Sequence, residues 1–212
     1  DIVFNWNGTT AGVCVPNADW INNSRNGLTI CDATSAAFAM NIDWSKLDVI
    51  TFSWQKCLGG EAGHGMLILS PKAIKRINTY NPPWPIPKLF QLKKNDKLNN
   101  EIFSGATINT PSMLCVEDFL DALNWCNNIG GLSELLNRSK NNLNIIKDWV
   151  SSSSWASFLS EEKLNISNTS ICLKLIDPFL VDLPLEVQND IEKNIIKLLE
   201  IEKVAFDIGS YR

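Results

Sequence analysis

The first eighty residues alternate short apolar runs with glycine, asparagine and aspartate. Four such runs are found, at residues 2–6, 28–31, 49–53 and 66–69. Short apolar runs with polar ends are typical of buried strands in an α/β sheet. The pattern therefore predicts an α/β fold for this part of the chain.

The rest of the chain contains further regular elements. Pro71 is expected to open a helix that continues to residue 80, and the proline-rich stretch 81–87 should be extended. Residues 93–100 are polar and predict an exposed loop, and residues 111–149 predict two helices interrupted at Gly130 and Gly131. A strand at 170–176, a helix at 185–202 and a strand at 204–208 would then form a β-α-β unit.

This order of elements predicts three segments. Residues 1–110 would be part of a large α/β domain, residues 111–150 a connecting helical segment, and residues 151–212 part of a smaller α/β domain. The 212 residues are 45% hydrophobic, which is sufficient to bury at least one core.

Composition argues against several classes of partner. The net charge is −4, so we expect no nucleic-acid partner, and no apolar run approaches the roughly 20 residues of a membrane helix. The six cysteines form no CxxC pair and only one histidine is present, so no metal site is expected. Reduced, buried thiols are typical of a cytoplasmic protein.

Two polar side chains follow predicted strands. Asp32 comes at the end of the run 28–31, and Lys56 comes shortly after the run 49–53 and before two glycines. Ligand sites of α/β proteins lie at the carboxyl ends of strands. Taken singly, Asp32 could be a helix cap or turn former, and Lys56 could extend along the surface into water.

Together, the two residues suit one cofactor. Pyridoxal 5'-phosphate requires a lysine for its Schiff base and an acidic residue that keeps its pyridine nitrogen protonated. Asp32 and Lys56 lie on consecutive predicted strands, so they are expected at the same edge of the sheet.

Five sequence motifs carry a family resemblance. They are Asn-Gly-Thr-Thr-Ala-Gly at residues 7–12, Cys-Asp-Ala-Thr-Ser at 31–35, Phe-Ser-Trp-Gln-Lys-Cys-Leu-Gly-Gly at 52–60, Gly-His-Gly-Met-Leu-Ile-Leu-Ser at 63–70, and Ile-Asn-Thr-Pro-Ser-Met at 108–113. In this order they resemble the phosphoserine aminotransferase family, class V enzymes of pyridoxal-phosphate fold type I. The resemblance implies the large cofactor-binding domain, with a mostly parallel mixed sheet flanked by helices, and part of the small C-terminal domain.

The resemblance also implies the site residues. Lys56 would form the Schiff base and transfer the proton, Asp32 would face the ring nitrogen, Thr9 would hydrogen-bond the cofactor, and Gln55 would contact its phosphate. The motif at 109–110 implies a homodimer, in which Asn109 and Thr110 reach the cofactor phosphate of the partner subunit; they could equally cap a helix before Pro111.

The substrates implied by the family are glutamate and 3-phosphohydroxypyruvate, in serine biosynthesis. Arg212 would bind an anionic group of the substrate, although Tyr211 stands where relatives have histidine. The lone His64 is expected to be structural. The family pattern extends beyond both ends of the chain, so we expect an internal fragment. Three alternatives remain open: an alanine-glyoxylate aminotransferase, a cysteine desulfurase, or a catalytically incomplete fragment.

Overall fold

The computed structural model describes residues 1–209, which fall into two compact units. The first unit contains residues 1–7 and 15–138. The second contains residues 8–14 and the chain from Ser139 onward. The expected domain boundaries at residues 110 and 150 stay predictions.

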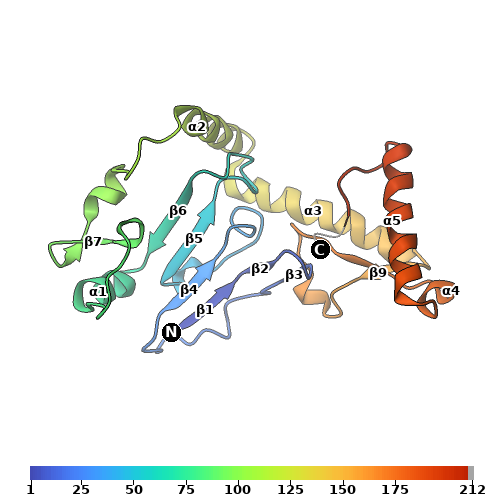
Figure 1. The fold of residues 1–212 in the computed structure, drawn as a ribbon, viewed down its shortest axis with the longest axis horizontal. Coiled ribbons are helices and arrows are strands. Elements are labelled where there is room, and N and C mark those ends of the chain that lie inside the picture. The colour runs from blue at the N-terminus through green and yellow to red at the C-terminus, as the bar shows by residue number, and fades with distance from the viewer. Residues whose placement is uncertain (210–212) are drawn as a thin grey trace. The chain divides into compact units, whose positions relative to one another are not determined.

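A four-stranded mixed sheet forms the centre of the first unit (Figure 1). Its order is β1 (Ile2–Asn5), β4 (Thr29–Asp32), β5 (Val49–Ser53) and β6 (Gly65–Leu69). β1, β4 and β5 are parallel, and β6 is antiparallel to β5. These are the four strands that the apolar runs predict, so the α/β prediction is confirmed.

A charged network holds the amino end of β5. The buried Asp48 carboxylate accepts hydrogen bonds from the Thr29 N–H at 2.9 Å, from the Ser70 hydroxyl at 2.8 Å and from the Arg25 guanidinium at 2.7 Å. Burial alone would raise the pKa of Asp48, but these hydrogen bonds and the charge of Arg25 lower it below its usual value. The network ties three strands and the start of a helix together at the end of the sheet opposite Lys56.

The helices of the first unit begin where capping residues allow. α1 (Pro71–Thr79) has Pro in its first turn, and the Ser70 side chain accepts from the Ala73 N–H. α2 (Met113–Asn128) is capped by Ser112, so the alternative cap at Asn109 or Thr110 is wrong. η1 (Trp44–Lys46) is a single short turn between β4 and β5.

A break at two glycines separates α2 from α3 (Gly131–Ser152), as the sequence predicts. Gly130 and Gly131 both have positive φ angles, of 119° and 67°, which residues with a Cβ rarely adopt. α3 begins in the first unit and continues into the second.

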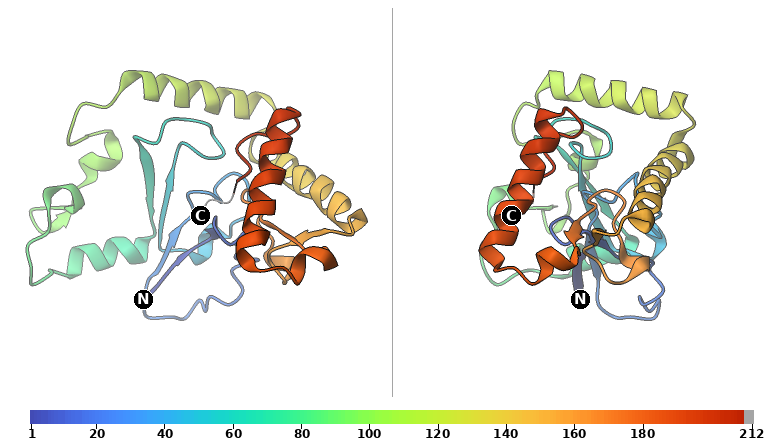
Figure 2. Two further views of the ribbon diagram at one scale, coloured as in Figure 1. Left: turned by 45° about the vertical axis from the view of Figure 1, so that its right-hand side comes forward. Right: turned by 90° about the vertical axis from the view of Figure 1, so that its right-hand side faces the viewer.

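The segment between α1 and α2 lies on the β6 side of the sheet in both sets of views (Figures 1 and 2). Residues 81–87 form neither helix nor strand, as expected, and η2 (Lys88–Phe90) and η3 (Asn100–Ser104) are short turns. The expected loop at 93–100 contains a hairpin of β7 (Lys93–Lys94) and β8 (Lys97–Leu98). Its turn residues, Asn95 and Asp96, have positive φ angles, which a two-residue hairpin favours.

The second unit contains small sheets, the end of α3 and two further helices. β2 (Asn7–Gly8), which begins at the last residue of the first unit's opening segment, pairs with β3 (Val13–Cys14), and β9 (Ala156–Phe158) pairs antiparallel with β10 (Leu173–Leu175). η4 (Lys163–Asn165) is a short turn between β9 and β10, and α4 (Pro178–Val181) and α5 (Leu185–Ile201) follow β10.

The predicted β-α-β unit is wrong in its last strand. α5 is present, but residues 204–208 form no strand. Lys203 takes a positive φ of 56°, and the Val204 N–H donates back to the Leu199 carbonyl at 2.9 Å. This pattern ends a helix with a left-handed residue and uses the N–H that a strand would need. Within residues 1–209, no helix is both long and apolar enough to cross a membrane.

Candidate active site

Asp32 ends β4 at the carboxyl edge of the sheet, and its carboxylate is exposed. Its Oδ1 accepts from the Thr34 N–H at 2.8 Å, and its backbone carbonyl accepts from the Trp6 N–H at 2.9 Å. These bonds fix the direction of the carboxylate. Within the described part of the chain Asp32 has no ion-pair partner, so its charge is available to a bound group.

Lys56 lies in the loop that follows β5. β4 and β5 are parallel neighbours, with Asp32 opposite Thr51, so both strands end at the same edge (Figure 1). Lys56 comes three residues after the last residue of β5, and its side chain is exposed. The fold therefore brings the Asp32 and Lys56 segments to one edge.

The loop that carries Lys56 is held at several points. The Gly59 N–H donates to the Lys56 carbonyl at 3.0 Å, and the Gly60 N–H donates to the Trp54 carbonyl at 2.9 Å. Gly59 has a φ of 69°, which explains the need for glycine in this turn. The main chain around Lys56 is consequently closed into a compact turn.

Leu58 anchors the same loop in a hydrophobic core. It is buried with Cys126 and Leu135, and half-buried apolar side chains pack around these three: Phe38, Phe119, Leu123 and Ile129. Lys56 thus lies two residues before Leu58, which packs against α2 and the start of α3. Phe119, Leu123 and Cys126 are three or four residues apart and so share one face of α2.

Trp54 contacts two other rings, one stacked on it and one tilted against it. Its indole lies parallel to Phe119, with centroids 4.0 Å apart, and the ring centroid of His64 is 4.9 Å from its own. The His64 carbonyl also accepts from the Ser53 hydroxyl at 3.0 Å. These contacts give His64 a part in the packing and leave its expected structural role a prediction.

Two buried polar atoms beside Lys56 require a partner. Trp54 Nε1 and Gln55 Oε1 are inaccessible to solvent, and neither has a hydrogen-bond partner within residues 1–209. Buried polar atoms in native proteins are nearly always paired. A polar group bound at this edge, or another segment of the protein, would supply the partners, and the site therefore fits a polar cofactor.

The remaining predicted site residues lie outside the Asp32 and Lys56 segments. Asn109 and Thr110 are exposed in the turn before α2, and within the described residues they make no hydrogen bond to Asp32 or Lys56. Thr9 belongs to the second unit, in the turn between β2 and β3. Arg212 and Tyr211 lie outside the described residues.

The Asn7 side chain connects the start of the Thr9 motif to the Asp32 segment. Its Nδ2 donates to the Ser35 hydroxyl at 2.9 Å, and Asn7 is buried.

The residues on either side of Asp32 are buried. Burial raises the pKa of the Cys31 thiol to about 12, so this cysteine is not ionised near neutral pH. The small residues Ala33, Ala36 and Ala37 are also buried, which lets the chain turn closely after β4.

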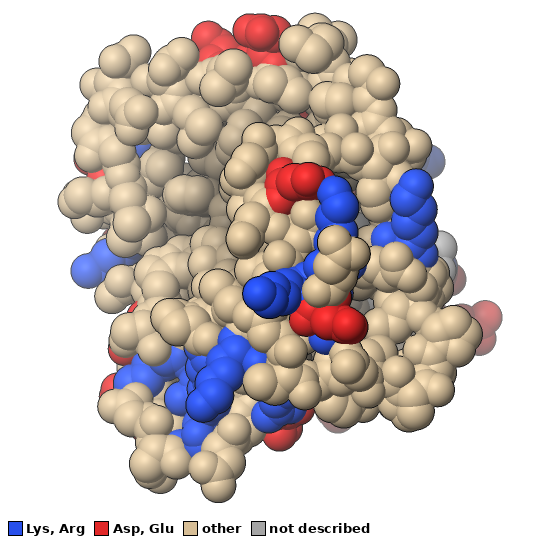
Figure 3. Space-filling view, turned by 90° about the vertical axis from the view of Figure 1, so that its left-hand side faces the viewer, with Lys and Arg blue, Asp and Glu red and all other residues tan. Residues whose placement is uncertain are grey.

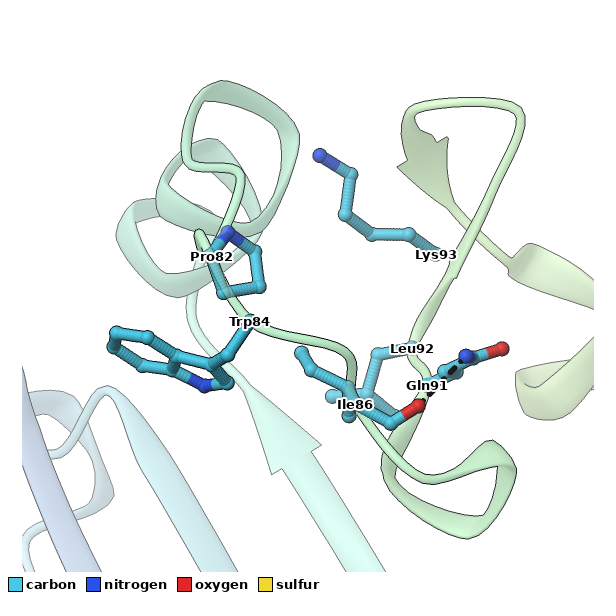
Figure 4. Close-up of a pocket in the computed structure, with 6 residues that line it drawn as sticks. All are labelled: Pro82, Trp84, Ile86, Gln91, Leu92 and Lys93. Carbon is cyan, nitrogen blue, oxygen red and sulfur yellow. Dashed lines mark hydrogen bonds between the residues drawn. The ribbon is translucent and has the colours of Figure 1, made fainter.

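A hollow of about 230 Å³ lies elsewhere in the first unit (Figure 4). Its lining consists of Pro82, Trp84, Ile86, Gln91, Leu92 and Lys93. The Gln91 amide donates to the Ile86 carbonyl at 2.8 Å, and Lys93 Nζ donates to the Asn81 side chain. Gln91 and Lys93 thus already have partners within the segment, and the hollow includes no predicted site residue.

Basic side chains gather on the side of the first unit that carries α1 and the hairpin (Figure 3). Residues 72–97 contain seven Lys and Arg and one acidic residue, Asp96. Several of these cations have internal partners: Arg76 pairs with Asp1, and Lys94 pairs with Glu101. These two ion pairs indicate that part of the basic cluster stabilises the fold.

Comparison with known proteins shows the family to which the chain is similar. Residues 2–192 match the family model described as aminotransferase class V. The chain is 57% identical to a phosphoserine aminotransferase of Methanosarcina mazei over all 212 residues, which are 55% of that protein. The chain thus spans about half the length of the curated relatives it matches.

Solved structures show the same fold. A phosphoserine aminotransferase from Cytophaga hutchinsonii superposes with a TM-score of 0.76 at 22% identity, covering 100% of this chain and 55% of that one. A pyridoxal-phosphate-bound phosphoserine aminotransferase from Trichomonas vaginalis gives 0.69 at 16% identity, covering 96% of this chain and 51% of that one. The predicted fold type I is confirmed, and the chain belongs to the aminotransferase class V family.

Proposed function

We propose that this chain supplies much of the active site of a phosphoserine aminotransferase. The reaction would transfer the amino group of glutamate to 3-phosphohydroxypyruvate, giving 2-oxoglutarate and O-phosphoserine for serine biosynthesis. The observation that carries the proposal is that Asp32 ends β4 and Lys56 lies in the loop after the adjacent parallel strand β5, in a chain 57% identical to such an enzyme.

The cofactor of this family is pyridoxal 5'-phosphate, which when bound acts as an electron sink for the substrate carbanion. Lys56 would hold the cofactor covalently and, once displaced by substrate, move a proton between the substrate Cα and the cofactor C4′. The Asp32 carboxylate, fixed by Thr34, would keep the ring nitrogen protonated. Together, the two roles require a basic and an acidic side chain at the same edge of the sheet.

The other predicted residues would bind and orient. Thr9 would donate to the cofactor, Gln55 would contact its phosphate through an amide that is already part-buried, and Arg212 would receive an anionic group of the substrate. The unpaired Trp54 Nε1 adds a buried donor at the same place. None of these side chains needs to change charge during the reaction.

Turnover tests the substrate proposal. A full-length chimera, in which residues 1–212 replace the matching part of the Methanosarcina mazei relative, can be offered glutamate or alanine with several keto acids. We expect glutamate with 3-phosphohydroxypyruvate to give the highest kcat/KM. A higher kcat/KM with alanine and glyoxylate would instead support an alanine-glyoxylate aminotransferase, and no turnover with any pair would contradict the proposal.

We further propose a cytoplasmic homodimer, with Asn109 and Thr110 reaching the partner's cofactor. Mixed dimers test this arrangement. A subunit with Lys56→Ala and a subunit with Asn109→Ala are each expected to be impaired alone. If the site is shared, refolding them together restores one intact site per mixed dimer. Activity no greater than the sum of the two separate variants would show that Asn109 acts within its own subunit.

A further inference from the structure

The turn that carries Thr9 is held by a segment more than 150 residues away in the sequence. Within the second unit, the Gly12 carbonyl accepts from the Ser167 N–H at 2.9 Å, and Val13 forms an antiparallel bridge with Ile166. The Cys14 thiol donates to the Ile166 carbonyl at 3.5 Å. One side of the turn is therefore attached to residues 166–167.

Cys172 holds the other side of the same turn. Its sulfur lies 3.6 Å from the main-chain carbonyl oxygens of both Thr9 and Thr10, so the single thiol proton is shared between two adjacent acceptors. The main chains also approach closely: a Cβ on Gly12 would lie 2.8 Å from the Cys172 Cβ and 2.9 Å from its backbone nitrogen. Gly12 has a φ of 65°, so glycine is required here by both space and conformation.

Cys172 is itself fixed in place. Its carbonyl accepts from the Leu159 N–H at 2.8 Å, which extends the β9–β10 pairing by one step. On its other side, the buried Ser167 hydroxyl accepts from the Thr169 and Ser170 N–H groups and orders the intervening turn. The thiol thus reaches Thr9 from an element whose position is set by a sheet.

We infer that Cys172 is a positioning residue for Thr9. It would act by fixing the main chain of Thr9, and so the direction in which the Thr9 hydroxyl meets the cofactor. The inference rests on the proposed contact of Thr9 with pyridoxal phosphate. It adds that this contact depends on the segment around Cys172 in the same unit, through a single thiol and the close approach at Gly12.

Equilibrium binding of pyridoxal phosphate to the apo form of the full-length chimera tests the inference. Cys172→Val removes the donor at similar volume, and Cys172→Ala removes it with some volume. We expect both to raise the Kd about threefold to tenfold, the range of one lost hydrogen bond. Cys172→Ser keeps a hydroxyl donor and should restore part of the loss; it also decides the question if Cys172→Val does not fold.

Cys14→Ala is the matched control, because it removes the same kind of bond from the same turn without touching Thr9 or Thr10. We expect its Kd to stay within about twofold of the wild type, with a loss of apo-protein stability similar to that of Cys172→Ala. An equal rise in Kd for Cys14→Ala would show a general loosening of the turn and overturn the inference.

A double-mutant cycle with Thr9→Val separates the inference from the proposed function. If Cys172 acts through Thr9, then Cys172→Ala has little further effect on the Kd in the Thr9→Val protein. Fully additive effects would overturn the inference while leaving the Thr9 contact intact. A Thr9→Val protein that binds the cofactor normally would instead refute the Thr9 contact, and the inference with it, while Lys56 and Asp32 would stay untouched.

Discussion

The indole of Trp54 and the ring of Phe119 are parallel within 1°, with their centroids 4.0 Å apart. This contact joins α2 to the loop that carries Lys56, next to the buried Leu58. The position of the lysine therefore depends on a helix that begins nearly sixty residues later in the chain.

Replacing Phe119 tests this support. Phe119→Ala should lower the free energy of unfolding of the full-length chimera by about 2 kcal/mol, because it removes the stacking and leaves a space beside Leu58. Urea unfolding measures the change. The neighbouring Leu120, 47% exposed on the same helix, gives the control: Leu120→Ala should cost less than about 1 kcal/mol. Equal losses would argue against the stacking contact.

Two glycines near Lys56 allow backbone strain to be measured without steric clash. A Cβ at Gly59 or at Gly63 would meet no atom within 4 Å, but only Gly59 has a positive φ. Gly59→Ala should therefore lower the free energy of unfolding by about 1 kcal/mol, whereas Gly63→Ala should change it by less than about 0.5 kcal/mol. Thermal and urea unfolding compare the two, and equal effects would refute a left-handed turn at residue 59.

The Asp48 network predicts a pH dependence of stability. The pKa of Asp48 is lower in the folded protein than in the unfolded chain, so its stabilising effect is present above the usual value of 3.8 and is lost as the pH falls through the folded pKa. Asp48→Asn removes the ion-pair partner of Arg25 and should cost about 3 kcal/mol at pH 7.

The Asp48→Asn protein should also lose less stability than the wild type between pH 5 and pH 2. Urea unfolding across this range measures both slopes. Asp19→Asn, at an exposed aspartate outside the network, should keep the wild-type slope. If the Asp48→Asn protein keeps it too, the carboxylate does not make the bonds described above.

The sequence predicted the sheet well because each strand carries its own signal. In β5 the buried Ile50 and Phe52 alternate with the exposed Thr51, and Ser70 with Pro71 marks the start of α1. Such patterns depend on neighbours along the chain. The same reading singled out Asp32 and Lys56, because Asp32 ends β4 and Lys56 lies three residues after β5.

The apolar residues 204–206 look like a strand, yet the Val204 and Ala205 N–H groups bond back to the Leu199 carbonyl of α5. The hairpin at Asn95 and Asp96 did carry a local turn signal, which the polar composition concealed. The contact of Cys172 with Thr9 spans 163 residues and has no local signal.

The central claim is that Lys56 holds the cofactor, and borohydride trapping followed by peptide mapping tests it most directly. The full-length chimera is loaded with pyridoxal phosphate, reduced, digested and analysed by mass spectrometry. We predict one modified peptide, with the label on Lys56; it should be absent from Lys56→Ala and present in the control Lys75→Ala, at an exposed lysine of α1. A label on another lysine, or one that persists in the Lys56→Ala protein, would contradict the account.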